Sequence, residues 1–169
     1  MDRIGSIFLI FCTYSFAEQK IVVLDMKYVL NNSKAGKGAQ EFLKKKFTDN
    51  IKKFSDIEKK LKKEEIDLLS QKATLSKEDY TKNVDDLRKK VIDFQSQRRA
   101  SIDKIATQRA ESRETLINTI DPILAAYLKE NKISLVVDKK YTLAGVPESD
   151  ITKIIVEKLN KVLPSLNLK

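Results

Sequence analysis

The 169-residue chain contains no histidine and no tryptophan, and its single cysteine is Cys12. The lack of histidine excludes His-based acid–base catalysis, His metal ligands and a histidine pH switch. Glycine and proline are also scarce, with four and three residues. A chain with so few helix breakers, 34% charged residues and 41% hydrophobic residues is typical of long, solvated helices rather than of a disordered segment.

The first residues have the pattern of a secretory signal peptide. The apolar run Ile4 to Phe11 follows a short charged start and is too short to span a membrane, which takes about 20 residues. Ser15 and Ala17 occupy the small positions of an A-x-A-like cleavage site. We therefore expect a signal peptide at residues 1–17, cleaved after Ala17; a buried N-terminal strand is the alternative. The mature chain would then lack cysteine and keep its net charge of +9.

Short β-branched runs flank a long helical region. The run KIVVLD at 20–25 predicts a buried strand, and MKYVLNN after it predicts one or two helical turns. We expect two further strands, at Ile133–Val137 and Tyr141–Ala144, and a closing helix capped near Ser149 or Asp150. The apolar side of that closing helix consists of Ile151, Ile154, Ile155, Leu159 and Val162.

Between these runs, apolar residues recur three or four positions apart, except for one seven-residue step, as one helix face requires. In the first arm they are Ala39, Leu43, Phe47, Ile51, Phe54, Ile57, Leu61 and Leu68. Ser76 and Asp79 form a capping box that starts a second helix, so the hairpin tip lies near residues 70–76. At about 1.5 Å per residue, the arms are about 57 and 67 Å long. We also expect a kink or break at Asp121–Pro122.

The second arm has a heptad seam that turns polar halfway along. Its apolar half is Tyr80, Val84, Leu87, Val91 and Phe94, and the following positions are Arg98, Ser101, Ile105, Gln108 and Ser112. A tight coiled coil keeps its seam apolar. We interpret the polar half as loosely packed or as lining a wet space, which makes Arg98 and Ser101 candidates for contact with a bound partner.

The stretch NNSKAGKGAQEF at 31–42 has the look of a phosphate-binding loop but lacks its signature. G-x-x-x-x-G-K-[ST] requires a glycine five residues before Gly36, where Asn31 stands, and Ser or Thr after Lys37. We interpret the stretch as a helix start capped by Ser33. Its small residues, which let the helix pack closely on the sheet, are Ala35, Gly36, Gly38 and Ala39.

Together these elements predict an α+β, mostly α fold: a strand, a long antiparallel helical hairpin, then two strands and a helix. We expect residues 35–120 to form the arm and residues 18–34 and 121–169 to form a small β/α body. Such a body buries too little surface to be stable alone and exposes strand edges. We therefore expect oligomerisation to complete it.

The sequence also resembles the Skp/OmpH family of periplasmic chaperones. The resemblance rests on KIVVLD followed by an S-x-A-G-K-x-A-Q helix start, on ISLVVD before a tyrosine, and on DIT opening the last helix. It covers essentially the whole mature chain, with Gly38 standing where alanine is usual. It implies a homotrimer with a small β-barrel body and three hairpins around a cavity. It also implies an ATP-independent holdase for unfolded outer-membrane proteins.

The charge distribution is consistent with that implied function. Residues 34–117 carry 22 Lys and Arg against 15 Asp and Glu, a net of +7 of the total +9. A basic cavity would attract acidic unfolded barrels, and an anionic lipid or lipopolysaccharide surface is a further candidate partner. Candidate client-binding residues are Lys44, Lys45, Lys52, Lys53, Lys59, Lys60, Arg88, Arg98, Arg99, Ser101, Arg109 and Arg113. We expect no catalytic residue, cofactor or metal, because the acids are interspersed with Lys and Arg as on solvated helix faces.

Two other functions share these features. A nucleic-acid-binding coiled coil would have the same basic charge, but acids mixed into every basic run and the export signal argue against specific nucleic-acid binding. An envelope spacer would need an apolar seam through residues 98–112, which this chain lacks. An enzyme is a more distant alternative.

Overall fold

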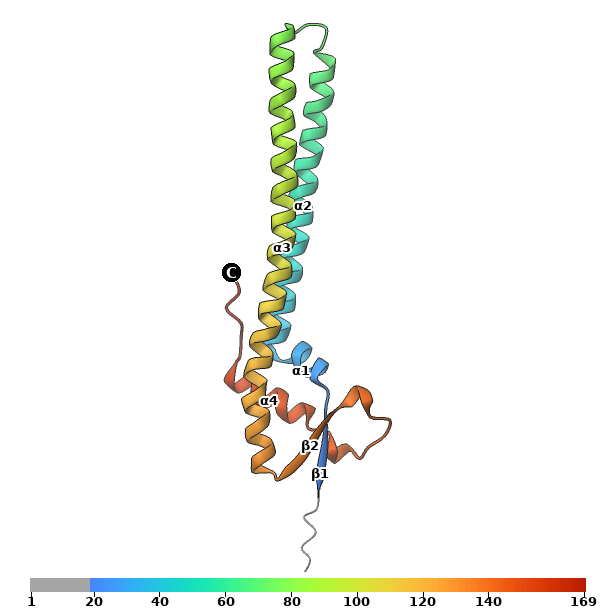
Figure 1. The fold of residues 1–169 in the computed structure, drawn as a ribbon, viewed down its shortest axis with the longest axis vertical. Coiled ribbons are helices and arrows are strands. Elements are labelled where there is room, and N and C mark those ends of the chain that lie inside the picture. The colour runs from blue at the N-terminus through green and yellow to red at the C-terminus, as the bar shows by residue number, and fades with distance from the viewer. Residues whose placement is uncertain (1–18) are drawn as a thin grey trace, which may run out of the picture.

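The computed structural model describes residues 19–169; the expected signal peptide, with Cys12, lies outside them. The elements in chain order are β1 (Lys20–Leu24), α1 (Met26–Asn32), α2 (Lys34–Ser70), α3 (Lys77–Glu130), β2 (Ile133–Asp138), the 3-10 turns Lys139–Tyr141 and Pro147–Ser149, and α4 (Thr152–Val162). Helices α2 and α3 form a long antiparallel hairpin that stands on a small base made by the other elements (Figure 1). The predicted fold class is confirmed.

Both long helices begin where the sequence predicts. Ser33 caps α2, its hydroxyl accepting from the Gly36 N–H at 3.1 Å. Ser76 caps α3 by accepting from the Asp79 N–H at 3.1 Å, and its hydroxyl donates to the Asp79 carboxylate at 2.7 Å. The chain reverses between these helices at residues 71–76, as predicted.

Of the predicted kink or break at Asp121–Pro122, the break is wrong, because α3 continues through Pro122 to Glu130. A proline inside a helix removes one backbone hydrogen bond and crowds the preceding turn. Here the surrounding turns are held by packing, since Leu116 and Ile120 are buried in the core of the base and Ile123 and Leu124 pack against it. Tertiary burial therefore overrides the local preference.

The sheet has two parallel strands, with Ile21 opposite Leu135 and Val23 opposite Val137. The other edge of β1 is capped by the Ile151 N–H, which donates to the Val23 carbonyl at 3.0 Å. The predicted strand Tyr141–Ala144 is wrong. Asp138 accepts from the Lys140 N–H at 3.0 Å and turns the chain into the 3-10 turn and an irregular loop. Among the described residues, β2 thus pairs only with β1.

The core of the base joins β1, β2, α1, α4, the start of α2 and the end of α3. It consists of Val22, Leu24, Val29, Leu30, Ala35, Leu116, Ile120, Ile133, Ile151, Ile155 and Leu159. Two residues predicted on the apolar side of α4, Ile154 and Val162, are instead exposed. Helix α4 has Ile151 at its N-cap without a side-chain bond, although Asp150 next to it accepts from the Thr152 N–H at 2.9 Å.

Of the small residues at the start of α2, Ala35 belongs to the core of the base and Gly36 lies closely against α1. A Cβ at Gly36 would collide with the backbone carbonyl of Leu30 in α1. Gly38 has no heavy atom near the place where its Cβ would lie, so the fold does not use its small size. In residues 19–169, the helices are either too short or too polar to cross a membrane.

Candidate binding groove on the helical arm

The two arm helices meet along a seam that is apolar at the middle of the hairpin and polar nearer the base. The rings of Phe54 and Phe94 pack edge to face with centroids 6.0 Å apart. Toward the base, the Asn50 amide donates to the Ser101 hydroxyl, and Lys46 donates to the Gln108 side-chain oxygen at 3.3 Å. Ser101 and Gln108 thus make polar contacts between the helices.

One flank of this seam is hollowed along most of the arm. Three adjoining cavities of about 630, 430 and 560 Å³ follow one another from the base toward the tip. The first two share Phe47 and the last two share Glu58. We call this surface the flank groove. Its lining includes large apolar side chains and cations from both helices: Lys44, Phe47, Ile51, Arg98, Ile102, Arg109 and Arg113.

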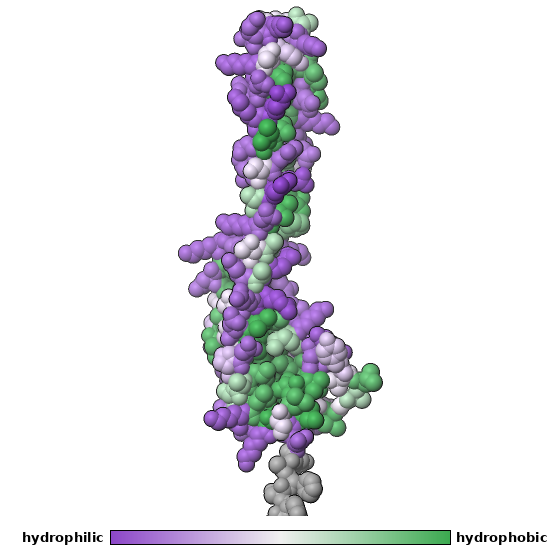
Figure 2. All heavy atoms as spheres, in the orientation of Figure 1, coloured by the Kyte–Doolittle hydropathy of each residue, from purple (hydrophilic) through white to green (hydrophobic). Residues whose placement is uncertain are grey.

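Large apolar side chains form the floor of the flank groove. Phe47, Ile51 and Ile102 are 46%, 55% and 51% exposed, and all three line the groove beside the seam. Apolar side chains interrupt the otherwise hydrophilic surface of the arm (Figure 2). A contiguous exposed apolar strip rimmed by polar residues is typical of an interaction site.

Cations form the rim of the flank groove. Lys44, Arg109 and Arg113 line the section next to the base, with Glu41 as its one carboxylate. Arg98 lines the middle section beside Ile102. Nearer the tip the rim is mixed, because Lys62 and Arg88 alternate with Glu58 and Glu65. The positive potential of the groove is therefore concentrated near the base.

The structure leaves most of the other predicted residues outside this groove. Lys45 is exposed and pairs with Asp49 at 3.0 Å, and the Lys53 ammonium lies 5.5 Å from the Phe54 ring centroid. Arg88 lies at the groove but also pairs with Asp85 at 3.1 Å. The remaining predicted cations are exposed and outside the lining: Lys52, Lys59, Lys60 and Arg99.

The sequence interpretation missed the apolar floor. The three- and four-residue spacing places Phe47 and Ile51 on the facing side of the first arm helix, and it places Ile102 on no face. Each four-residue step turns a helix by about 400°, so a run of such steps drifts about 40° at a time away from the facing side. Leu43, Phe47 and Ile51 are spaced in this way, and this drift is the signal that places the last two on the flank.

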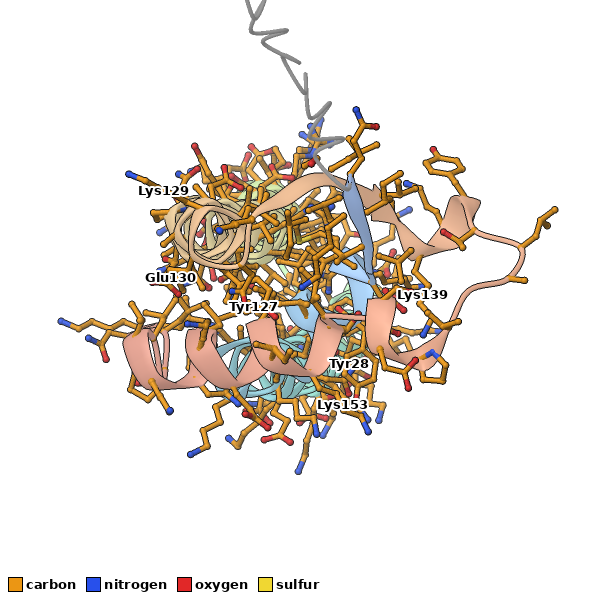
Figure 3. The ribbon with its side chains drawn as sticks, turned by 90° about the horizontal axis from the view of Figure 1, so that it is seen from below. Tyr28, Tyr127, Lys129, Glu130, Lys139 and Lys153 are labelled. Atoms are coloured by element: carbon orange, nitrogen blue, oxygen red, sulfur yellow. The ribbon has the colours of Figure 1, made fainter. Side chains whose placement is uncertain are left out.

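A separate cavity of about 610 Å³ lies at the base, under the loop that follows β2. Tyr28, Lys139 and Lys153 line it near the N-terminal end of α4 (Figure 3). Asp150 lies at its wall, and although desolvation raises the pKa of this carboxyl, hydrogen bonds from Lys139 and Thr152 outweigh that effect and lower the pKa to about 2. Residues 19–169 contain no acidic or thiol cluster that could hold a metal ion.

Comparison with known proteins identifies relatives of this arrangement. A family model described as outer membrane protein (OmpH-like) matches residues 20–159. The fold is similar to that of a candidate OmpH-like outer membrane chaperone from Caulobacter crescentus CB15, with a TM-score of 0.81 and 16% identity over 90% of each chain. No curated protein matches the sequence significantly.

Proposed function

The chain belongs to the OmpH-like outer membrane protein family, as its motifs predicted, and from this premise we propose that it is an ATP-independent periplasmic holdase chaperone. In this proposal, residues 1–17 are removed on export and the mature chain forms a homotrimer. The trimer binds unfolded outer-membrane β-barrel proteins between its arms and prevents their aggregation. It uses no catalytic residue and no cofactor.

The observation that carries the proposal is the flank groove. An unfolded barrel strand alternates apolar and polar side chains. The half-exposed floor of Phe47, Ile51 and Ile102 offers apolar contact to one side of such a strand. Around it, Lys44, Arg98 and the arginines nearer the base can cover apolar surface with their stems while their charges stay hydrated. Many weak contacts of this kind hold a client without fixing its conformation.

The base supports the trimeric part of the proposal. We assign residues 18–34 and 121–169 to a trimerisation body. A two-stranded parallel sheet is an incomplete structure, because parallel sheets are normally buried on both faces. The unpaired edge of β2 and the exposed side chains of Ile21 and Leu135 on the sheet offer both hydrogen bonds and apolar surface to a neighbouring copy.

The test compares two charge reversals of equal size. One variant replaces the groove cations Lys44, Arg98, Arg109 and Arg113 with Glu; the other replaces the distal cations Lys52, Lys53, Lys59 and Lys60 with Glu. Each removes four cations and adds four anions per chain, so steering by the whole arm falls in both. We expect the groove variant to lose about tenfold or more in affinity beyond the distal one.

The measurement is the concentration of chaperone that halves the light scattering of a urea-diluted outer-membrane barrel protein, at low and at physiological salt. Unchanged protection by the groove variant at low salt would contradict the proposal. Equal losses in the two variants would leave a holdase that attracts its client by net charge and does not use the groove.

A further inference from the structure

The segment after α4 does not project into solvent. Residues 163–169 leave the end of α4 and run back along the side of the hairpin (Figure 1). They form no helix or strand, but Leu163, Leu166 and Leu168 are half-buried while Pro164, Ser165 and Asn167 are exposed. We call this segment the tail. The family match ends at residue 159, so the tail lies outside the part of the chain that the family model describes.

Both arm helices donate a hydrogen bond to the same oxygen atom at the end of the tail. The backbone oxygen of Lys169 accepts from the Lys46 ammonium at 2.7 Å and from the Gln108 amide at 2.7 Å. Lys46 is itself positioned by the Gln108 side-chain oxygen and by the Phe42 ring, whose centroid is 4.9 Å from the ammonium. Lys46 and Gln108 form a clamp, and this clamp contacts only backbone of the tail.

The clamp lies on the flank of the hairpin opposite the flank groove. Lys46 directly precedes the groove residue Phe47, and Gln108 directly precedes the groove residue Arg109. One residue turns a helix by about 100°, which takes the clamp residues to the other side of the seam. The base of the arm therefore has one open flank and one flank that its own tail covers.

We propose that the covered flank is a second site for extended polypeptide, and that the tail is its tethered occupant, which a client must displace. This inference rests on the proposed holdase function. The tail is bound in the way the flank would bind a client strand: Leu166 and Leu168, at alternating positions, are half-buried, and an oxygen of Lys169 enters the clamp. The clamp holds a main-chain oxygen of Lys169, the last residue, and no hydrogen bond joins it to a side chain of the tail. The end of an extended segment can therefore enter the clamp whatever its side chains are.

The covalent connection of the tail to α4 determines how strongly the tail competes with external segments for the covered flank. A short flexible connection gives an effective concentration in the millimolar range. If the site binds an extended segment with a dissociation constant of about 0.1 mM, the tail lowers its apparent affinity for external segments about tenfold. A client that contacts the open flank at the same time can overcome that barrier, so the tail favours long clients over short peptides.

The test uses the full chain with the tail released. Leu166→Ser with Leu168→Ser removes the apolar contacts, and Asn167→Ser is a matched control at an exposed position between them. The probe is a fluorescent peptide with the tail sequence LPSLNLK, followed by polarisation. We expect the released variant to bind the probe about tenfold more tightly than the wild type and the control. Adding Lys46→Met and Gln108→Leu should remove this gain.

Equal binding of the probe by the wild type and the released variant would overturn the inference, as would a gain that survives loss of the clamp. Leu168→Ser alone provides a second release variant, because Leu166 packs against the core of the base and Leu168 does not. Capture of a urea-diluted barrel protein is measured in parallel. Failure of every variant to capture it would count against the proposed function, whereas the peptide result decides the tail.

Discussion

Gly36 and Gly38 stand two positions apart in the first turns of α2. Gly36 lies against the backbone of α1, whereas Gly38 has open space where a Cβ would lie. Helix propensity favours alanine over glycine at either position by about 1 kcal/mol. At Gly36 an added Cβ would collide with the Leu30 backbone, which cannot rotate away, so overpacking should exceed the propensity gain. We expect Gly36→Ala to lower the free energy of unfolding by about 1–3 kcal/mol.

Gly38→Ala is the matched control, because nothing lies near its Cβ position. We expect it to raise the free energy of unfolding by about 0.5–1 kcal/mol. Urea denaturation followed by far-UV circular dichroism measures both changes. A Gly36→Ala variant as stable as Gly38→Ala would show that α1 and α2 do not approach each other as closely as described.

Asp150 is the residue whose protonation at low pH should destabilise the small domain at the foot of the hairpin. It accepts from the Lys139 ammonium at 2.6 Å and from the Thr152 N–H at 2.9 Å, and its pKa is lowered to about 2. A carboxyl with a lowered pKa stabilises the folded state above its unfolded pKa, near 3.9, and that contribution is lost as the pH falls toward 2. Because Lys139 is half exposed, we expect the loss to be about 1 kcal/mol.

The measurement is the free energy of unfolding between pH 5 and pH 2 for the wild type and Asp150→Asn. Asparagine keeps an acceptor for the Thr152 N–H but cannot titrate. The variant should therefore be less stable at pH 5 and should approach the wild type at pH 2. A constant difference across this range would mean that the carboxylate charge does not contribute. The pKa of Asp138 is also lowered, by the Lys140 N–H, but Asp138 is present in both the wild type and the variant, so its effect on stability cancels in the difference.

The helices and strands that could be predicted from the sequence are those whose residues determine them locally, through apolar spacing or a capping side chain. The long helices follow from three- and four-residue spacing, and their starts follow from the Ser33 and Ser76 caps. The break at Pro122 and the strand at 141–144 were predicted wrongly because both depend on tertiary surroundings. Core packing carries α3 past Pro122, and a strand forms only where a second strand offers a partner.

The flank groove was predictable only in part, for a similar reason. Counting charges identified Lys44, Arg98, Arg109 and Arg113 as candidates, but counting does not tell which cations share one side of a two-helix arm. That depends on how far each position has drifted from the seam. Ile102, one residue after the seam position Ser101, is exposed at the groove floor although a core role would be the default for isoleucine.

At the scale of the whole molecule, the base exposes apolar surface that a monomer would leave in water. In the loop after β2, Tyr141 is 76% exposed, and Leu143 and Val146 are also exposed. If the proposed homotrimer buries this loop and the edge of β2, Leu143→Asp with Val146→Asp would place unpaired charges in the interface. We expect the variant to dissociate, while Ile92→Asp, at an exposed arm position outside the groove lining, keeps the wild-type mass.

Light scattering after size exclusion measures these masses for the chain from residue 18, alone and with a urea-diluted barrel protein. The wild type should have three times the mass of the mature chain and form a soluble complex of three chains with one client. If the client must be enclosed by three arms, the dissociated variant should lose capture even though each flank groove is intact. Capture by a stable monomer would instead mean that one groove suffices and that the trimer has another purpose.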